Sequence, residues 1–419
     1  MDGKAVDEAI ASGTTYGNPE TEHALFAQLR SEDPVHWTEP DGYKPFWTVT
    51  RHADVVAVQR AHEQFINAPR QHLVSLDFEA LVKQAMGGRK HLTKSMHLMD
   101  GEQHTAYREI TANWFFPQQV KLLDKSISAL ARRAIDDLER KAPECDFYRD
   151  IAVWYPLRVI MLILGLPDSD APLLQRLTSS YFGGSDPEMQ TAGDVIDAAL
   201  ALRQYFDVVA ADRRAHPTDD VSSLIANGTV NGRPLEQYES ASYYVALATA
   251  GHDTTSACIA GGVLALIQNP DQWQKLKENP SLIPTAVDEI IRWVSPIKHF
   301  FRTATQDCEV GETPVKAGDS LMMVYTSANR DELAFDQPFS FRVDRKPNRH
   351  VGFGYGVHMC LGMMLAKFEI QILLREMLTR IDSLELNGTP AWVESGFISG
   401  LKRLPISFQM KQSQAALAE

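Results

Sequence analysis

Cys360 is the residue whose surroundings in the sequence most strongly indicate a reactive group. It lies in the segment Phe353–Gly362, which holds three glycines and leads into a stretch with helical spacing from Leu361 onward. Gly354 and Gly356 allow the backbone to turn tightly and to approach a flat ligand, which residues with a Cβ could not do. Backbone N–H groups and the positive end of the following helix would stabilise a negative sulfur. The segment therefore predicts a thiolate held beside a flat ligand.

A thiolate of this kind suits haem iron, because it pushes electron density onto the metal and favours cleavage of an O–O bond. The alternative is a structural or free cysteine next to a glycine-rich turn. The ten positions of Phe353–Gly362 fit the pattern Phe-Gly-x-Gly-x-His-x-Cys-x-Gly, and the chain resembles the cytochrome P450 family over nearly its whole length. The resemblance implies haem b (iron protoporphyrin IX), with Cys360 as the only protein ligand of the iron and with Phe353 and Gly354 in the cofactor-binding loop.

A second motif, Ala250–Thr255, lies in the middle of a long helical pattern. Gly251 is a poor choice there, since glycine in a helix costs about 1 kcal/mol relative to alanine. Thr254 can donate a hydrogen bond back to the carbonyl of Ala250 and bend the helix. Such a departure from local preference is typical of functional sites, although a buried threonine beside a solvent-facing aspartate is the alternative. The resemblance implies that this is an oxygen-binding groove, in which Thr254 steadies bound O₂ and Asp253 relays protons.

The pair Glu289 and Arg292 is expected on a short helix that ends before Pro296. Its i, i+3 spacing places the carboxylate and the guanidinium on one helix face. Alone, such a pair carries little information, because most are exposed and contribute little. The resemblance gives it a structural role, in which it locks to the loop before Cys360 and takes no part in catalysis.

Haem carboxylates need cationic or hydrogen-bonding partners when they are held away from water. The resemblance implies that role for four residues: His104, Arg108, Arg302 and His358. For His104 and Arg108, which are four positions apart, the alternative is a solvated helix face. Lys298 and His299 bring two further polar side chains close to the expected substrate, or alternatively to a haem propionate.

Composition limits the classes of protein that need to be considered. The 419 residues carry a formal net charge of −13, which argues against nucleic acid as a partner. The four cysteines form no CxxC pair and the 13 histidines show no metal-ligand spacing, so neither a disulfide framework nor a second metal site is expected. The charged N-terminus and the short apolar run at Val159–Leu164 match neither a signal peptide nor a membrane helix. We therefore expect a soluble cytoplasmic protein with no membrane partner, and the resemblance implies a monomer.

The elements that must position these residues are mainly helices. Helical spacing covers Val120–Arg140, Ile151–Leu166, Ala192–Arg213, Tyr238–Leu266, Pro270–Lys277 and Leu361–Ile381. Strand character gathers in Pro45–Val58, Phe301–Val324 and Leu384–Phe408. Two Asn-Gly pairs in Ala226–Arg233 predict a turn or short hairpin.

The pattern thus predicts a mainly α fold with a smaller β part. The resemblance sharpens this to the triangular, helix-rich cytochrome P450 fold in a single domain over residues 1–419. It implies an N-terminal β-containing part near 35–65, a helical core near 104–295 and a haem-binding loop at 350–362.

Longer blocks, Tyr243–Thr255 among them, resemble the α-terpineol monooxygenase type within the family. Ala246 and Ala250 lie one helical turn apart on the side expected to face the haem and leave room over the iron. Apolar residues of two loops are expected to complete the wall: Ile297, Phe300, Phe397 and Ile398. We expect hydroxylation of an unactivated C–H bond in a small apolar compound, a monocyclic terpenoid or an alkylbenzene. A steroid or long-chain acyl substrate is the alternative and would need a wider entrance at Tyr181–Pro187.

The resemblance implies O₂ as co-substrate and electrons from a separate ferredoxin and NAD(P)H-dependent ferredoxin reductase. The sequence has no GxGxxG after a strand and no cysteine cluster for an iron–sulfur centre. A basic cluster before Cys360 could attract an acidic ferredoxin, with a solvated loop as the alternative: Arg342, Arg345, Lys346 and Arg349. Two other functions, a haem sensor or carrier and a peroxide-driven peroxygenase, are disfavoured because neither needs the pair Asp253 and Thr254.

Overall fold

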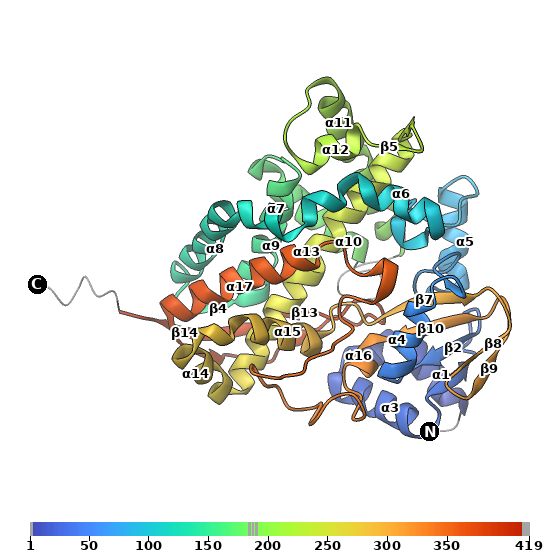
Figure 1. The fold of residues 1–419 in the computed structure, drawn as a ribbon. Coiled ribbons are helices and arrows are strands. Elements are labelled where there is room, and N and C mark those ends of the chain that lie inside the picture. The colour runs from blue at the N-terminus through green and yellow to red at the C-terminus, as the bar shows by residue number, and fades with distance from the viewer. Residues whose placement is uncertain (1–2, 183–185, 187, 189–191, 413–419) are drawn as a thin grey trace, which may run out of the picture.

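The longest helix of the described structure, α13 (Gln237–Gln268), crosses the helical part of the molecule (Figure 1). The computed structural model describes residues 3–182, 186, 188 and 192–412. Helix α13 begins where Glu239 accepts a hydrogen bond of 2.9 Å from the backbone N–H of Glu236, which is half of a capping box. Most of its residues are buried, which explains why its sequence is apolar around nearly the whole circumference.

The other helices pack around α13 or flank the main sheet (Figure 1). Those that precede it are α1 (Gly3–Ala11), α2 (Gly13–Tyr16), α3 (Pro19–Glu32), α4 (His52–Arg60), α5 (Leu76–Ala85), α6 (Gly101–Ala112), α7 (Pro117–Leu122), α8 (Asp124–Glu139), α9 (Trp154–Ile163), α10 (Ala171–Phe182), α11 (Ala192–Ala215) and α12 (Val221–Ala226). Those that follow it are α14 (Pro270–Glu278), α15 (Ile283–Val294), α16 (Tyr325–Ala328) and α17 (Met363–Arg380). A π-helical turn, Tyr148–Ala152, leads into α9.

Two glycines of α13 let neighbouring helices approach closely. An ideal Cβ at Gly251 would lie 2.8 Å from the side chain of Ile160 on α9. One at Gly261 would lie 2.6 Å from Val294 on α15. Both distances are too short for a real contact, so a larger residue would push the helices apart. Packing thus accounts for Gly251, which the sequence pattern marked only as an anomaly inside a helix.

The main sheet joins two distant parts of the chain in one layer, in the strand order β1–β2–β10–β7–β3 (Figure 1). Its strands are β1 (Val35–Thr38), β2 (Phe46–Val49), β3 (Phe65–Ile66), β7 (His299–Ala304) and β10 (Ser320–Val324). Strands β2 and β10 pair in parallel, and the other pairs are antiparallel. The sheet therefore fixes the segment before Arg302 against the first 70 residues of the chain.

Smaller sheets complete the β part. They are β11–β14–β4, made of Ile381–Leu386, Pro405–Met410 and Glu144–Asp146, and the pairs β12 with β13 (Ala391–Trp392, Leu401–Arg403), β5 with β6 (Thr229–Val230, Arg233–Pro234) and β8 with β9 (Cys308–Val310, Thr313–Val315). The predicted mainly α fold with a smaller β part is confirmed. Nowhere in the described ranges does a helix have the length and apolar character needed to cross a bilayer.

The predicted hairpin at Ala226–Arg233 is confirmed, with Asn231 and Gly232 in its turn at φ of 52° and 76°. The strand prediction for Pro45–Val58 is wrong beyond Val49, because α4 begins at His52. Two features of α4 explain the error. Its valines favour strands on their own, but Val55 and Val58 are three positions apart, both are buried, and they face the core from one side of a helix.

The buried carboxylate of Glu289 on α15 fixes the segment that leads to Cys360. Arg292 donates to it from Nε and Nη2, both at 2.8 Å. Arg345 donates from Nε at 3.0 Å and Asn348 from its amide at 3.1 Å. Glu289 and Arg292 are fully buried, so each charge depends on the other and on these hydrogen bonds.

Arg292 also binds the preceding loop directly. Its Nη1 donates to the carbonyl oxygens of Asn329 and Pro338, each at 2.8 Å. Asn329 in turn accepts a 2.8 Å hydrogen bond from the N–H of Val351, at the start of the cysteine loop. A continuous set of bonds therefore runs from α15 to the segment that carries Cys360.

We expect Glu289→Gln to lower the free energy of unfolding by about 3–5 kcal/mol, because two guanidinium groups would remain buried without their counter-charge. Urea unfolding of the purified protein measures the loss. The matched control is Asp307→Asn, which removes the exposed pair with Lys316 (side chains 69% and 74% exposed) and is expected to cost less than about 1 kcal/mol. Similar losses in the two variants would contradict the role assigned to Glu289.

Candidate active site

The loop around Cys360 is held by its own backbone. The Cys360 N–H donates to the carbonyl of Phe353 at 2.9 Å, and the Gly354 N–H donates to that of Val351 at 2.8 Å. Gly354 and Gly356 have φ values of 69° and 71°, which glycine adopts without the strain that a side chain would bring. The chain thus folds back so that Cys360 lies next to Phe353. Helix α17 begins three residues after Cys360.

Helix α4 closes this loop from outside, through a residue that the sequence gave no reason to select. The Gln59 side chain accepts a hydrogen bond from the N–H of Tyr355. An ideal Cβ at Gly356 would lie 2.7 Å from the Gln59 carbonyl oxygen. Only glycine therefore fits at this position. The sequence gave no reason to select Gln59, because the predicted strand ended one residue before it. In the structure Gln59 lies on the buried side of helix α4.

Cys360 is exposed, yet the surrounding protein raises the pKa of its thiol, against the effect of the Gly362 and Met363 N–H groups and of Arg108. The N–H groups and the guanidinium favour the thiolate. The loop therefore offers the sulfur hydrogen-bond donors and a positive charge that support its anionic form.

Four predicted cofactor ligands gather beside this loop. The rings of His104 on α6 and His358 in the loop are 4.0 Å apart between centroids. Arg108 donates from Nη2 to the carbonyl of Met359 at 2.8 Å. Arg302 on β7 is buried, and within the described residues its guanidinium donates only to the Phe301 carbonyl, at 2.7 Å.

One carboxylate accompanies this cationic cluster, and the sequence motifs did not reveal it. Asp100 accepts hydrogen bonds from the N–H groups of Asn67 and Ala68, at 2.8 and 3.0 Å, and its carboxylate lies 3.6 Å from Nε2 of His358. Burial raises the pKa of Asp100, but these donors outweigh burial and the pKa is lowered overall. The available signal was an aspartate before the glycine that begins α6, a position that favours helix caps.

The residues present fit a haem. A buried guanidinium at Arg302 without a carboxylate partner is costly unless an anion joins it, and haem propionates supply two. The thiol of Cys360 supplies the soft sulfur ligand that haem iron accepts. In the described part of the chain no cluster of histidine, cysteine and carboxylate groups could hold another metal ion.

The second predicted motif lies on an accessible side of α13. Ala246, Ala250 and Thr254 follow one another at four-residue intervals and are each at least partly accessible, whereas the residues from Ala241 to Val245 are buried. Thr254 donates from Oγ1 to the Ala250 carbonyl at 2.7 Å. Its only proton is therefore engaged, and its lone pairs remain free to accept a hydrogen bond.

Asp253 is held in strongly desolvating surroundings, and its Oδ2 has no hydrogen-bond partner. Burial raises the pKa of this carboxyl, while His252 opposes the shift. His252 is fully buried: its ring Nε2 donates to the Val153 carbonyl at 2.8 Å and its Nδ1 contacts the Thr178 hydroxyl at 2.9 Å. His252 thus ties α13 to α9 and α10 and fixes the backbone that carries Asp253.

A further buried acid faces the same helix from α17. Burial raises the pKa of Glu369 well above its usual range, and a hydrogen bond from Thr255 opposes this. Its Oε2 has no partner. Burial therefore favours the neutral, protonated form of Glu369. Sequence reasoning did not select it, because a glutamate at a helical position is usually exposed.

The structure brings together the four loop residues expected in the substrate wall. Ile297 and Ile398 form an isolated antiparallel bridge. The rings of Phe300 and Phe397 are 5.6 Å apart between centroids. The loop reaches α13 at Gly400, where an ideal Cβ would lie 3.6 Å from the Ala257 side chain. These residues therefore form one apolar wall, and the loop that carries two of them reaches α13 at Gly400.

Two expectations about charged residues are wrong. Lys298 does not face substrate or propionate, because it pairs with buried Glu22 at 2.5 Å. His299 is satisfied by the Leu73 N–H at 3.0 Å and the Gly396 carbonyl at 2.8 Å. Arg345 is not part of a surface basic cluster either, because it is buried against Glu289. Only Lys346 and Arg349 of that cluster are exposed, while Arg342 is half-buried.

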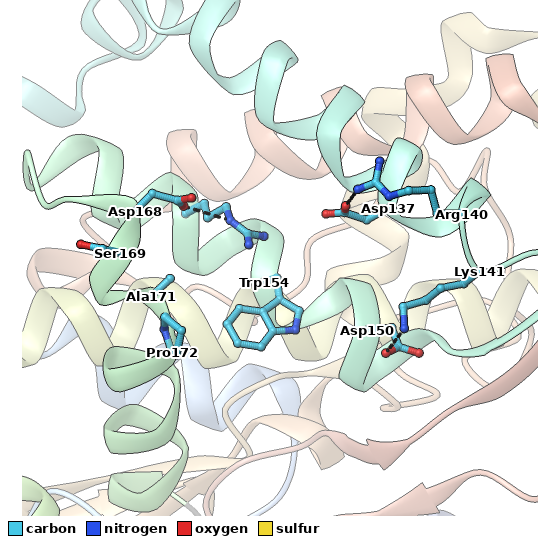
Figure 2. Close-up of a pocket in the computed structure, with 10 residues that line it drawn as sticks. Asp137, Arg140, Lys141, Asp150, Trp154, Asp168, Ser169, Ala171 and Pro172 are labelled. Atoms are coloured by element: carbon cyan, nitrogen blue, oxygen red, sulfur yellow. Dashed lines mark hydrogen bonds and ion pairs between the residues drawn. The ribbon is translucent and has the colours of Figure 1, made fainter.

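A hollow of about 540 Å³ lies elsewhere on the surface, between α8, α9 and α10 (Figure 2). Its charged groups are already paired. Arg158 pairs with Asp168 at 3.1 Å, and Figure 2 shows Lys141 beside Asp150, which lie 2.9 Å apart. None of its lining residues belongs to the motifs above. Its charged side chains are therefore already engaged in ion pairs with one another.

Comparison with known proteins gives one consistent result. A family model described as Cytochrome P450 matches residues 207–406. Cytochrome P450-terp of a Pseudomonas species is 41% identical over 405 residues, which cover 94% of this chain and 95% of the relative. Steroid C26-monooxygenase of Mycolicibacterium smegmatis is 32% identical over 91% of this chain and 89% of its own length.

Solved structures agree with these relatives. CYP108D1 from Novosphingobium aromaticivorans superposes with a TM-score of 0.91 at 39% identity and covers 97% of this chain and 99% of its own. A cytochrome P450 of Mycobacterium marinum in complex with pseudoionone gives a TM-score of 0.88 at 31% identity, over 95% of this chain and 97% of its own. The similarity therefore covers the elements that carry Cys360 and Thr254 alike.

We expect Gly356→Ala to destabilise the protein more than Gly318→Ala. Both glycines have a positive φ, of 71° and 91°, so both substitutions carry the left-handed strain of about 1–2 kcal/mol. Only the first adds a contact with the Gln59 carbonyl, since nothing lies within 4 Å of a Cβ at Gly318. Thermal unfolding of the two variants measures the difference, and equal melting temperatures would contradict the close packing of α4 on the cysteine loop.

Proposed function

The chain belongs to the cytochrome P450 family and is a haem-dependent monooxygenase, and from this premise we propose that it hydroxylates an unactivated C–H bond of a small apolar compound. The observation that carries the proposal is the apolar wall of Ile297, Phe300, Phe397 and Ile398, whose loop reaches α13 at Gly400. Such a wall binds mainly by burial of apolar surface, at about 25 cal/mol per Å².

Haem b is the cofactor of the family, and when bound it supplies the chemistry that activates O₂ for insertion of one oxygen atom into a C–H bond. We propose that Cys360 is its only protein ligand through sulfur. Four residues would hold its carboxylates: His104, Arg108, Arg302 and His358. Phe353 and Gly354 would line the sulfur side, since the Phe353 carbonyl accepts from the Cys360 N–H and Gly354 is the next residue in the turn.

Thr254 and Asp253 are proposed as the residues that manage protons. The Thr254 hydroxyl donates its hydrogen bond to the Ala250 carbonyl, so its oxygen remains able to accept a hydrogen bond at the accessible side of α13. Oδ2 of Asp253 has no hydrogen-bond partner and lies in a desolvated site. Such a site favours the protonated carboxyl, which can donate its proton to a neighbour. The pair would therefore hold and deliver protons beside the bound substrate.

Small ring compounds are the preferred substrate class, as monocyclic terpenoids or alkylbenzenes. Support comes from the tight aromatic wall, from the name of cytochrome P450-terp and from the pseudoionone bound to the Mycobacterium marinum relative. A steroid is the second candidate, because steroid C26-monooxygenase is also similar to the chain. The entrance that such a substrate would need, Tyr181–Pro187, lies partly outside the described residues.

Electrons are proposed to come from a separate ferredoxin and an NAD(P)H-dependent ferredoxin reductase. The predicted docking cluster is reduced to exposed Lys346 and Arg349, with half-buried Arg342 nearby in ion pairs with Asp336 and Asp344. Two exposed cations would influence the rate of association with an acidic partner more than the affinity.

We expect Thr254→Ala to keep substrate binding but to lower the product formed per reduced cofactor several-fold, with peroxide released instead, because the accepting hydroxyl is lost. Asp253→Asn should slow turnover with a smaller loss of this coupling, since it removes a proton donor rather than a positioning group. Product, peroxide and cofactor consumption are measured together in the reconstituted system.

Thr249→Ala is the matched control. Thr249 lies on the same helix and makes the same backbone bond, from Oγ1 to the Val245 carbonyl at 2.7 Å, but it is buried. This variant should remain coupled. Full coupling in Thr254→Ala would exclude the proposed role, and turnover driven equally well by peroxide in both proteins would instead indicate a peroxygenase.

Titration with a panel of apolar compounds tests the substrate class. Terpenoids and alkylbenzenes of about ten carbons should shift the haem Soret band at micromolar concentration, because they fill an apolar wall of this kind. A complete shift with steroids or long-chain acids, and none with small ring compounds, would overturn the choice.

Cys360→Ser is the control for the titration, because its reduced carbon monoxide form should lose the far-red Soret band of thiolate ligation. Replacing Cys145, Cys258 or Cys308 should leave that band in place. If the band survives in Cys360→Ser, another residue binds the iron.

A further inference from the structure

His72 is the polar side chain of the apolar wall whose hydrogen-bonding atoms the protein leaves unused. Its Nδ1 is buried without a partner, and no described residue hydrogen-bonds its Nε2. The two neighbouring histidines differ. His299 uses both ring nitrogens, with the Leu73 N–H and the Gly396 carbonyl, and Nδ1 of His97 lies 2.6 Å from the Ser95 hydroxyl.

An aromatic row places His72 relative to the cofactor residues. The His72 ring stacks on Phe397, with centroids 4.6 Å apart and planes inclined by 27°. Phe397 contacts Phe300, and Phe300 stacks on His97 with centroids 5.8 Å apart. The charges of Arg302, Arg108 and His358 act on His97. The row therefore begins beside the cationic cluster and ends at His72, so that His72 stands at the far end of the substrate wall.

The enclosure of Nδ1 decides which nitrogen carries the proton. A buried N–H without an acceptor costs more than a buried lone pair without a donor, because each unmade donor bond loses its full hydration. The favoured tautomer therefore has its proton on Nε2. Burial lowers the pKa of His72 to about 4, so the ring is neutral at physiological pH. His72, which is only half-buried, accordingly presents a neutral N–H donor.

The charged groups near the wall are held by the protein, which limits what this donor can recognise. Lys298 is paired with Glu22. Arg70 is buried, donates to the Pro45 and Lys44 carbonyl oxygens at 3.4 and 3.2 Å, and lies over the Phe301 ring, while its Nε is enclosed without a partner. Neither cation is exposed toward a ligand carboxylate, so a neutral oxygen is the acceptor that fits the neutral ring of His72.

We propose that His72 donates a hydrogen bond from Nε2 to a hydroxyl or carbonyl oxygen of the substrate, and that the substrate is an oxygen-bearing ring compound rather than a hydrocarbon. The inference rests on the proposed function and specifies its substrate class. A neutral hydrogen bond that replaces an unmade one favours the oxygen-bearing ligand by about three- to tenfold in Kd. The aromatic row supplies the affinity for the carbon skeleton, and His72 selects among compounds that share it.

The test compares matched ligands that share one ten-carbon ring skeleton. The pairs are α-terpineol with p-menth-1-ene, and menthol and menthone with p-menthane. Kd values are measured on the haem-loaded protein by the Soret shift and by calorimetry, without turnover. Wild type should bind at least one oxygen-bearing member about three- to tenfold more tightly than its hydrocarbon. His72→Phe, which keeps the stack on Phe397, should bind both members equally.

Two amide variants separate hydrogen bonding from packing and replace His72→Phe if that variant does not fold. His72→Gln carries an N–H at about the reach of Nε2 and should retain part of the preference, whereas His72→Asn reaches only the Nδ1 position and should lose it. Phe300→Leu is the control for the wall and should weaken both members of each pair alike.

Each outcome decides a separate point. A preference for the oxygen-bearing member that survives in His72→Phe and His72→Asn, or that is absent from wild type, overturns the role of His72 and leaves the proposed function standing. Wild type that binds neither member of any pair contradicts the proposed function itself, and the inference falls with it.

Discussion

A carboxylate enclosed by protein must be neutralised where it stands, and this constraint on Glu289 organises the approach to the active site. Glu289 receives hydrogen bonds from Arg292, Arg345 and Asn348, and Arg292 passes the connection on to Asn329. These partners come from α15 itself, from the end of α16 and from the segment 345–348, and the structure assigns no helix or strand to residues 329–355. Without a buried counter-charge at their centre, the loop before Cys360 would have few reasons to keep one conformation. The position of the sulfur therefore depends on an ion pair that takes no part in chemistry.

A second constraint acts on helix α13. Within the same few residues, one face must pack tightly against its neighbours while another face stays accessible. Gly251 lets α9 approach on one side, and His252 bonds to Val153 and Thr178 on the same side. With that face fixed, the opposite face can leave Ala250 and Thr254 uncovered without loosening the helix. Packing thus explains His252, which lies between Gly251 and Asp253. By holding the backbone of α13, His252 also fixes the position of Asp253. Rigid support behind an accessible pair is what precise placement of catalytic groups requires.

The sequence predicted those parts of the site that lie in short, locally constrained segments. The turn of the cysteine loop follows from Gly354 and Gly356, and the bond from Thr254 to Ala250 follows from helix geometry, so both could be anticipated. Contacts between distant segments could not. Gln59 and Asp100 precede Cys360 by about 300 and 260 residues in the sequence. Contacts at such separations form only in the folded chain. Neither residue type is unusual in its local sequence, so nothing marked the two residues in advance. Arg345 shows the opposite error, since a run of basic residues suggested a surface although one of them is the partner of a buried acid.

The cationic cluster shows how the fold and the cofactor depend on each other. Burial, together with neighbouring positive charges, lowers the pKa of His104 to about 4, and burial lowers that of His358, although Asp100 opposes it. The protein alone therefore favours the neutral form of both imidazoles, which limits the repulsion between them and the two arginines. We propose that the two haem carboxylates lie among these groups, where their negative charge would favour the imidazolium form. Cofactor binding and proton uptake at the two histidines would then be linked. A site that is electrostatically incomplete without its ligand binds that ligand and becomes more stable for the same reason.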